Sequence, residues 1–142
     1  MIALTGNDLT LKDIQAIIFK GEGAVVSDEG WNRVTSGREA VEKILKEGKT
    51  VYGINTGFGK LSDVIIDGDR LDELQMNLIR SHACGVGEPF PEAIAKTMCL
   101  LRANTLLKGY SGVRPVVIER LLDMVNRNVV PVIPEQIGRA HV

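Results

Sequence analysis

A mainly α-helical fold is predicted by two features of this 142-residue sequence. Apolar residues recur at intervals of three and four positions, which is the spacing of a buried helix face. Glycines and prolines, which interrupt helices, separate these stretches from one another. The composition, 44% hydrophobic and 25% charged, is that of one globular domain.

Two helices are predicted before residue 48. The first covers residues 10–19 and ends at Gly21; its apolar residues at helical spacing are Leu11, Ile14, Ile17 and Ile18. The second begins after Ser27, whose hydroxyl can cap it, and acidic residues in its first turn suit the helix dipole. It ends near Gly48, and its expected buried stripe comprises Trp31, Val34, Val41, Ile44 and Leu45.

Three further helices are predicted after a glycine-rich loop at residues 51–60. The first begins at Asp69, and its apolar seam of Leu71, Leu74 and Leu78 continues to His82 on the same face. The next covers residues 92–108, carries a face of small residues and ends at Gly109. The last is expected to be capped by Ser111, to admit Pro115 near its first turn, to bury Leu121, Leu122 and Val125, and to fray at residues 126–128.

Charge and composition exclude several classes of partner. A formal net charge of -1, with acids and bases interspersed, gives no footprint for nucleic acid or an anionic membrane. No apolar run approaches membrane-spanning length, and residues 1–20 lack the pattern of a signal peptide, so we expect a cytoplasmic protein. The two cysteines, Cys84 and Cys99, are expected to be reduced, small apolar fillers.

Familiar cofactor motifs are not matched. The loop at residues 51–60 lacks the glycine spacing and the Ser or Thr of a phosphate-binding loop. Gly57-Phe58-Gly59 and Gly21-Glu22-Gly23 lack the third glycine of a dinucleotide fingerprint, and no parallel βαβ pattern is expected around either. No set of metal ligands stands out, so we expect neither a metal nor a nucleotide.

The most informative segment is the loop itself, which reads VYGINTGFGK over residues 51–60. Its glycines can lay the main chain against a small ligand, and Tyr52 at its edge is then a candidate for chemistry. Taken alone, Tyr52 more often packs at a helix end, His82 is more often a core histidine, and Asn55 more often bonds local backbone.

Four motifs occur in order along nearly the whole chain. They are YGINTGFG at residues 52–59, NLIRSHACGVG at 77–87, GYSGVR at 109–114 and VPVIP at 130–134. Together they resemble the histidine and aromatic amino acid ammonia-lyases, from about residue 4 to residue 136. The resemblance implies the N-terminal helical and loop region of an ammonia-lyase-type helical fold, truncated before the central helical bundle.

The resemblance also implies a reaction and a set of site residues. Family members eliminate ammonia from an α-amino acid, a small-molecule substrate, with the help of a methylidene-imidazolone ring, which forms from an internal Ala-Ser-Gly and is their self-derived cofactor. Tyr52 would be the catalytic base that removes the β-proton. His82, Asn55 and Gly59 would bind substrate, with His82 reading its side chain. Whole enzymes of this family are homotetramers.

The Ser81-His82 pair resembles the histidine and tyrosine branches of the family. The stretches around Gly87 and Gly109 favour the histidine branch, so we expect conversion of L-histidine to trans-urocanate in histidine catabolism. Tyrosine or phenylalanine ammonia-lyases and aminomutases are the alternatives. A non-catalytic helical module that self-associates through the small residues at 93–103 is an alternative of another class.

The end of the chain departs from the family pattern. Pro134-Glu135-Gln136 would normally lead into the Ala-Ser-Gly segment, whereas residues 137–142 match nothing in it. We therefore expect residues 1–136 to be the N-terminal region of an ammonia-lyase and residues 137–142 to be an artefactual tail. Without the Ala-Ser-Gly segment, this fragment alone is expected to be inactive.

Overall fold

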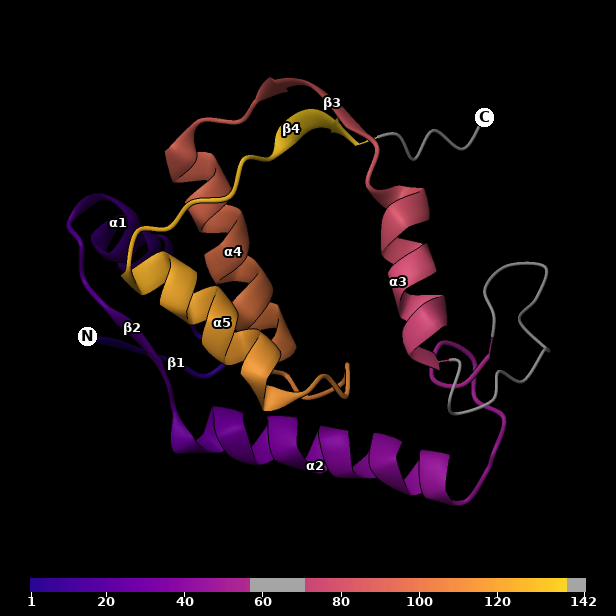
Figure 1. Cartoon of the computed structure of the whole chain (residues 1–142). Helices are drawn as coiled ribbons and strands as arrows, with labels where there is room; N and C mark the ends of the chain where they lie inside the picture. Colours follow the sequence, from indigo (N-terminus) through magenta and orange to yellow (C-terminus); the bar gives the residue numbers. More distant parts are fainter. Residues whose placement is uncertain (57–70, 138–142) are drawn as a thin grey trace. The chain divides into compact units, whose positions relative to one another are not determined.

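The computed structural model describes residues 1–56 and 71–137 (Figure 1). The expected helix start at Asp69 lies outside these residues. The chain divides into two compact units. Unit 1 comprises Met1–Ala40 and Pro89–Ile133, and unit 2 comprises Val41–Glu88 and Pro134–Val142.

The helices predicted from the sequence are all present in the described part of the chain. They are α1 (Leu11–Phe19), α2 (Asp28–Lys46), α3 (Leu71–His82), α4 (Glu92–Leu106) and α5 (Pro115–Asn126). The prediction of a mainly α fold is therefore confirmed. Short strands, which were not predicted, accompany them: β1 (Ile2–Leu4), β2 (Ala24–Val26), β3 (Gly85–Pro89) and β4 (Pro134–Ile137).

Strand β1 precedes α1 in the sequence and β2 follows it, and the two strands pair in parallel. Ile2 lies opposite Ala24 and Leu4 opposite Val26. The expectation that no parallel βαβ pattern surrounds Gly21-Glu22-Gly23 is therefore wrong. These glycines follow the helix, however, whereas the glycines of a dinucleotide-binding fold follow the first strand. Strands β3 and β4 pair with each other in unit 2.

The starts of α1, α2 and α5 are formed in different ways. Thr10 and Asp13 form a capping box at α1, where each side chain accepts a hydrogen bond from the other residue's backbone N–H. Ser27 caps α2 as predicted, since its Oγ accepts from the Gly30 N–H at 3.1 Å. The prediction for Ser111 is wrong: α5 begins at Pro115, which needs no N–H partner at the first helical position.

The hydrophobic core lies in unit 1. Leu4, Ile17, Leu100 and Ile118 bring together β1, α1, α4 and α5, and each is at most 1% exposed. The small residues of α4 belong to this core, since Ala95 and Ala103 are buried in it. The stripe predicted for α2 is only partly buried, because Leu45 is exposed.

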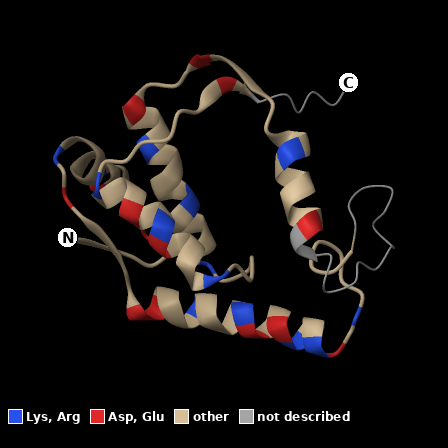
Figure 2. Cartoon of the chain, viewed as in Figure 1, with Lys and Arg blue, Asp and Glu red and all other residues tan. Residues whose placement is uncertain are grey.

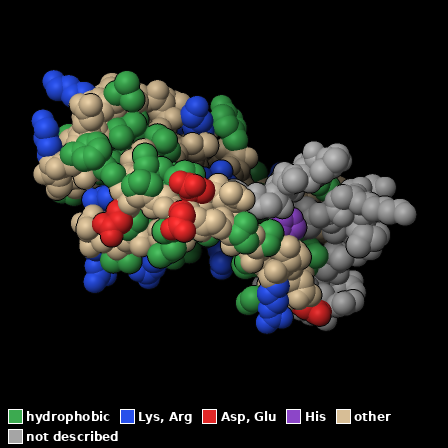
Figure 3. Space-filling model, turned by 90° about the horizontal axis from the view of Figure 1, so that it is seen from above, with side chains coloured by type: hydrophobic (Ala, Val, Ile, Leu, Met, Phe, Trp, Pro, Cys, Tyr) green, Lys and Arg blue, Asp and Glu red, His purple; other side chains and the backbone are tan. Residues whose placement is uncertain are grey.

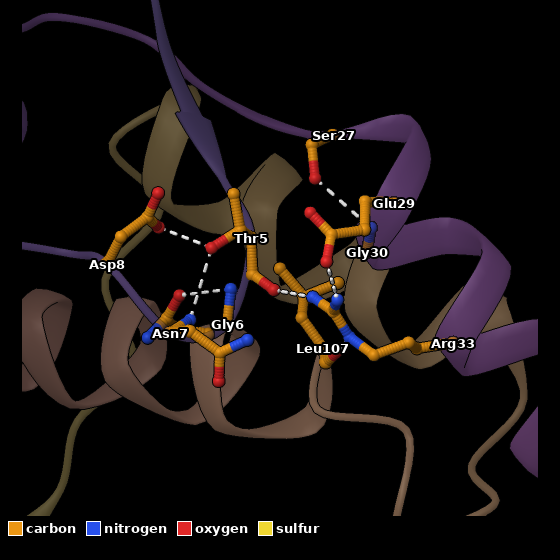
Figure 4. A network of polar contacts seen from close by, with 10 residues as sticks. Thr5, Gly6, Asn7, Asp8, Ser27, Glu29, Gly30, Arg33 and Leu107 are labelled. Carbon is orange, nitrogen blue, oxygen red and sulfur yellow. Dashed lines mark hydrogen bonds and ion pairs between the residues drawn. The ribbon is translucent and has the colours of Figure 1, made fainter.

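Polar contacts also connect distant segments of unit 1 (Figure 4). Arg33 of α2 forms an ion pair with Glu29 and donates to the backbone carbonyls of Thr5 and Leu107. Asn126 accepts from the Ala24 N–H at 2.8 Å and donates to the Ala24 carbonyl at 2.9 Å. The predicted fraying at residues 126–128 is therefore wrong for Asn126, which is fixed against β2.

The surface of the described residues is mixed in charge and partly apolar. Acidic and basic side chains intermingle along α2 (Figure 2). Hydrophobic side chains also reach the surface of unit 1 (Figure 3), among them Ile94, Met98 and Leu101 on one face of α4. None of the described helices combines the length and hydropathy needed to cross a bilayer.

Candidate functional site

The residues predicted to form the site all belong to unit 2. Tyr52 and Asn55 lie in the loop after α2, and His82 is the last residue of α3. Gly59 lies outside the described residues, as do the neighbouring Gly57 and Phe58. The geometry can therefore be followed for Tyr52, Asn55 and His82.

Tyr52 occupies a tight turn. The N–H of Ile54 donates to the carbonyl of Val51 at 3.1 Å, which closes the turn around Tyr52 and Gly53. Gly53 has φ +76°, and apart from Gly53 and its two neighbours in the chain, no atom of the described residues lies within 4 Å of where its Cβ would be. Glycine is thus favoured by the left-handed backbone rather than by lack of space. Tyr52 is 63% exposed on this turn.

Asn55 stabilises this turn through its side-chain amide. Its side chain is buried, with Oδ1 accepting from the Val51 N–H at 3.0 Å and Nδ2 donating to the Lys49 carbonyl at 2.9 Å. Both ends of the amide are therefore bonded to local backbone, which is the structural role that asparagine commonly has in turns. Asn55 sets the path of the chain that presents Tyr52.

His82 lies at the exposed end of α3 and not on a buried seam. Leu74 and Leu78 are half-buried as expected, but the imidazole of His82 is exposed, so the predicted continuation of the seam is wrong. The helix ends directly after it, and an exposed helix end leaves the ring accessible. Its Nδ1 lies 3.0 Å from the carbonyl oxygen of Leu78 and 2.9 Å from Oγ of Ser81.

Ser81 is the residue that sequence reasoning missed as part of the site. Its hydroxyl donates to the Leu78 carbonyl at 3.0 Å and also contacts the imidazole of His82. A serine directly before a histidine at a predicted helix end was the available signal. Serine hydroxyls in the last turn commonly bond a carbonyl one turn back, which brings Ser81 beside the ring.

The two cysteines differ in environment. Cys99 is a buried filler, as expected, and burial raises the pKa of its thiol. Cys84 is exposed, so the expectation that it fills apolar space is wrong. Its Sγ donates weakly to the His82 carbonyl at 3.5 Å. Across residues 1–56 and 71–137, no three potential metal-ligating side chains gather at one point.

An open groove lies in unit 1. It runs between α2 and the loop after α4, and its lining includes Ser36, Lys108 and Tyr110. Of the predicted site residues that the structure describes, Tyr52, Asn55 and His82 are not among its lining residues. Arg33, which also borders it, is committed to Glu29 and to backbone carbonyls.

Comparison with known proteins gives a consistent result. The family model for aromatic amino acid lyases matches residues 9–138. A histidine ammonia-lyase of Bacillus cytotoxicus is 55% identical over 136 residues, which are 96% of this chain and 27% of that protein. The chain therefore spans about a quarter of the length of this curated relative.

Solved structures agree in fold. Histidine ammonia-lyase from Trypanosoma cruzi is 44% identical with a TM-score of 0.86, covering 95% of this chain and 26% of that one. Tyrosine aminomutase from Streptomyces globisporus is 35% identical with a TM-score of 0.87, over the same shares of 95% and 26%. Because the family model covers nearly all of the sequence, this chain belongs to the aromatic amino acid lyase family.

Proposed function

We propose that the whole protein to which this chain belongs eliminates ammonia from L-histidine to give trans-urocanate. The observation that carries the proposal is the 55% identity to a histidine ammonia-lyase along 96% of the chain. Identity to the solved histidine enzyme, 44%, also exceeds the 35% to the tyrosine aminomutase. The Ser81-His82 pair fits the histidine and tyrosine branches alike and does not distinguish between them.

The described side chains fit separate roles in this reaction. Tyr52, exposed on its turn, is the proposed base that takes the β-proton. Asn55 acts through the turn, because its buried amide bonds the backbone that positions Tyr52. His82 is the proposed contact for the substrate side chain. Gly59 stays a proposed substrate-binding residue outside the described part.

The methylidene-imidazolone ring would supply activation of the leaving amine. Its precursor is an Ala-Ser-Gly tripeptide, and the 142 residues contain Ser-Gly only after Thr35 and after Tyr110. These 142 residues therefore lack the tripeptide from which the ring forms. We propose that the 142-residue chain produced alone is inactive. Residues 1–136 are proposed to be the enzyme's N-terminal region and residues 137–142 a foreign tail, although Ile137 is the last residue of β4.

A cytoplasmic homotetramer is proposed for the whole protein, as the family resemblance implies. Tyrosine or phenylalanine substrates are the alternatives within the family. The alternative of a non-catalytic module that self-associates through the small residues of α4 has to be revised, because these residues are buried in the core. Self-association would have to use the exposed Ile94, Met98 and Leu101 instead.

The test is an ammonia-release assay on the purified whole protein. L-Histidine, L-tyrosine and L-phenylalanine are offered separately, and urocanate is followed by its absorbance. We expect turnover of L-histidine, and Tyr52→Phe should lower kcat by about 10²–10⁴-fold because proton transfer loses its base. Tyr110→Phe, at the only other tyrosine of this sequence, is the matched control. Turnover of tyrosine alone would transfer the protein to the alternative branch, and no turnover of any amino acid would favour the binding module.

A further inference from the structure

Lys96 of α4 is the one charged residue that is buried in the described part of the chain, with 9% of its surface exposed. Its Nζ donates to Oδ1 of Asn128 at 3.0 Å. An ammonium group has three N–H donors, and this bond uses one of them. No carboxylate within residues 1–56 and 71–137 forms an ion pair with it. Among the described side chains, a neutral amide is thus the partner of this positive charge.

Asn128 is held in place by the backbone at the end of α5. It has φ +54°, a left-handed conformation that usually belongs to glycine directly after a helix. Its N–H donates to the Val125 carbonyl at 3.4 Å. The next N–H, that of Val129, donates to the Met124 carbonyl at 2.9 Å, which completes a Schellman motif. Asn128 is exposed, so the ammonium group bonded to it lies near the surface of unit 1.

The surroundings of Lys96 suit contact with another protein segment that carries a negative charge. Burial disfavours an ammonium ion unless an anion pairs with it. The C-terminal carbonyls of α5 carry only a partial negative charge, which does not replace a carboxylate. The chain that follows Asn128 also presents apolar side chains to solvent, since Val129 is 57% and Val132 82% exposed. An incoming segment can therefore bury apolar surface here and pair with the buried cation.

The length of the relatives indicates where this segment comes from. These residues span 27% of the curated relative, so most of a protein of that length lies outside them. We propose that Lys96 and Asn128 form a docking site for an aspartate or glutamate side chain from the remaining part of the same polypeptide, which completes a buried ion pair. The proposal goes beyond the reaction and does not depend on which amino acid is the substrate.

A crystal structure of the whole protein tests the ion pair directly. We expect a carboxylate oxygen, from a residue of the same polypeptide outside these 142, within about 4 Å of Nζ of Lys96. A carboxylate from within the 142 residues or from a neighbouring subunit would overturn the proposal. An inorganic anion or water alone at this position would do the same.

A substitution that keeps the volume of the side chain tests the energetic consequence. Lys96→Met should raise the unfolding equilibrium constant of the whole protein by about 10²–10³-fold, because a buried carboxylate loses its partner. In the 142-residue chain it should raise this constant by less than about fivefold, since only the bond to the exposed Asn128 is lost. Denaturant unfolding measures both effects, and equal effects would overturn the proposal.

Lys108→Met is the matched control. Lys108 is exposed, and its side chain has no polar partner among the described residues. The substitution should leave the unfolding equilibrium constant unchanged in the whole protein and in the 142-residue chain. A loss in the whole protein as large as that of Lys96→Met would show that the effect is not specific to Lys96, and would overturn the proposal.

Discussion

Unit 1 and unit 2 are stabilised in different ways. Every buried hydrophobic side chain among the described residues lies in unit 1. The buried residues described in unit 2 are polar, namely Asn55 and Thr56. Hydrogen bonds of Arg33 and Asn126 join segments far apart in the sequence, whereas those of Asn55 and His82 stay within six residues.

The difference shows that the residues forming the hydrophobic core and the proposed site residues lie in different parts of this chain. The helices and strands of unit 1 form a scaffold with its own core, and they contribute none of the proposed site residues. The described site residues, Tyr52, Asn55 and His82, lie on a turn and at a helix end, and these two segments are ordered by contacts within themselves. A functional side chain on a loop, positioned by a more rigid scaffold, is the common arrangement in enzymes.

The same substitution in the two units should have very different effects. Leu100→Ala removes a side chain that is 0% exposed, and we expect it to lower the free energy of unfolding by about 2–5 kcal/mol. Leu78→Ala, on the half-buried face of α3, should cost about 1 kcal/mol because less apolar surface is lost. Denaturant unfolding of both variants measures the contrast, and equal losses would contradict it.

A glycine contact in unit 1 should be nearly as sensitive as the core. A Cβ on Gly37 would lie 2.0 Å from the carbonyl oxygen of Gly109, so Gly37→Ala forces α2 and the loop after α4 apart. We expect a loss of about 3 kcal/mol, although alanine would normally favour a helix by about 1 kcal/mol. Ser36→Ala at the neighbouring exposed position is the control. A Gly37→Ala variant as stable as the parent would show that the close approach is absent.

Two asparagines that use both ends of their amide sharpen the comparison. Asn126→Ala breaks both bonds to Ala24 across unit 1, and it should lower the free energy of unfolding by about 1–3 kcal/mol. Asn55→Ala breaks equivalent bonds to Val51 and Lys49 but only within its loop. Its effect should be confined to faster hydrogen exchange at the Val51 N–H, with global unfolding unchanged. A global loss in Asn55→Ala would show that the loop is part of the main cooperative unit.

The smallest expected effect is an acid dependence of unit 1 at α1. Hydrogen bonds from the Thr10 side chain and backbone lower the pKa of Asp13 below its ordinary 3.8. A carboxyl with a lowered folded-state pKa stabilises the fold above its unfolded pKa, and this contribution is lost as the pH falls through the lowered value. Asp13→Asn should remove this dependence, whereas Asp28→Asn should keep it. Circular dichroism of both variants below pH 3.8 tests the prediction.

The helices could be predicted from the sequence because their signals are local. The spacing of apolar residues, together with the glycines and prolines between helices, located all of these helices. The side chains of Thr10 and Ser27 cap the starts of α1 and α2. The strands could not be predicted in this way. Ile2–Leu4 and Ala24–Val26 are three residues long, too short to show alternation, and they form only because they pair with each other.

The candidate site was predicted in part. Motif resemblance singled out Tyr52, Asn55 and His82, but not the surroundings of each side chain. The helical spacing that placed His82 beside Leu78 is real, yet it does not reveal that the helix ends at that residue with the ring exposed. The contact of Ser81 with the ring depends on rotamers at this helix end, which periodicity does not encode.

The most direct test of the contrast between the two units is amide hydrogen exchange on the 142-residue chain, resolved by residue. The amides of α4 and α5 in unit 1 should exchange only through global unfolding, because these helices enclose the buried core. The amides of α3 at residues 75–82 in unit 2 should exchange much faster, through local opening. Equal protection in α4 and α3 would contradict the division into a packed scaffold and a locally ordered site.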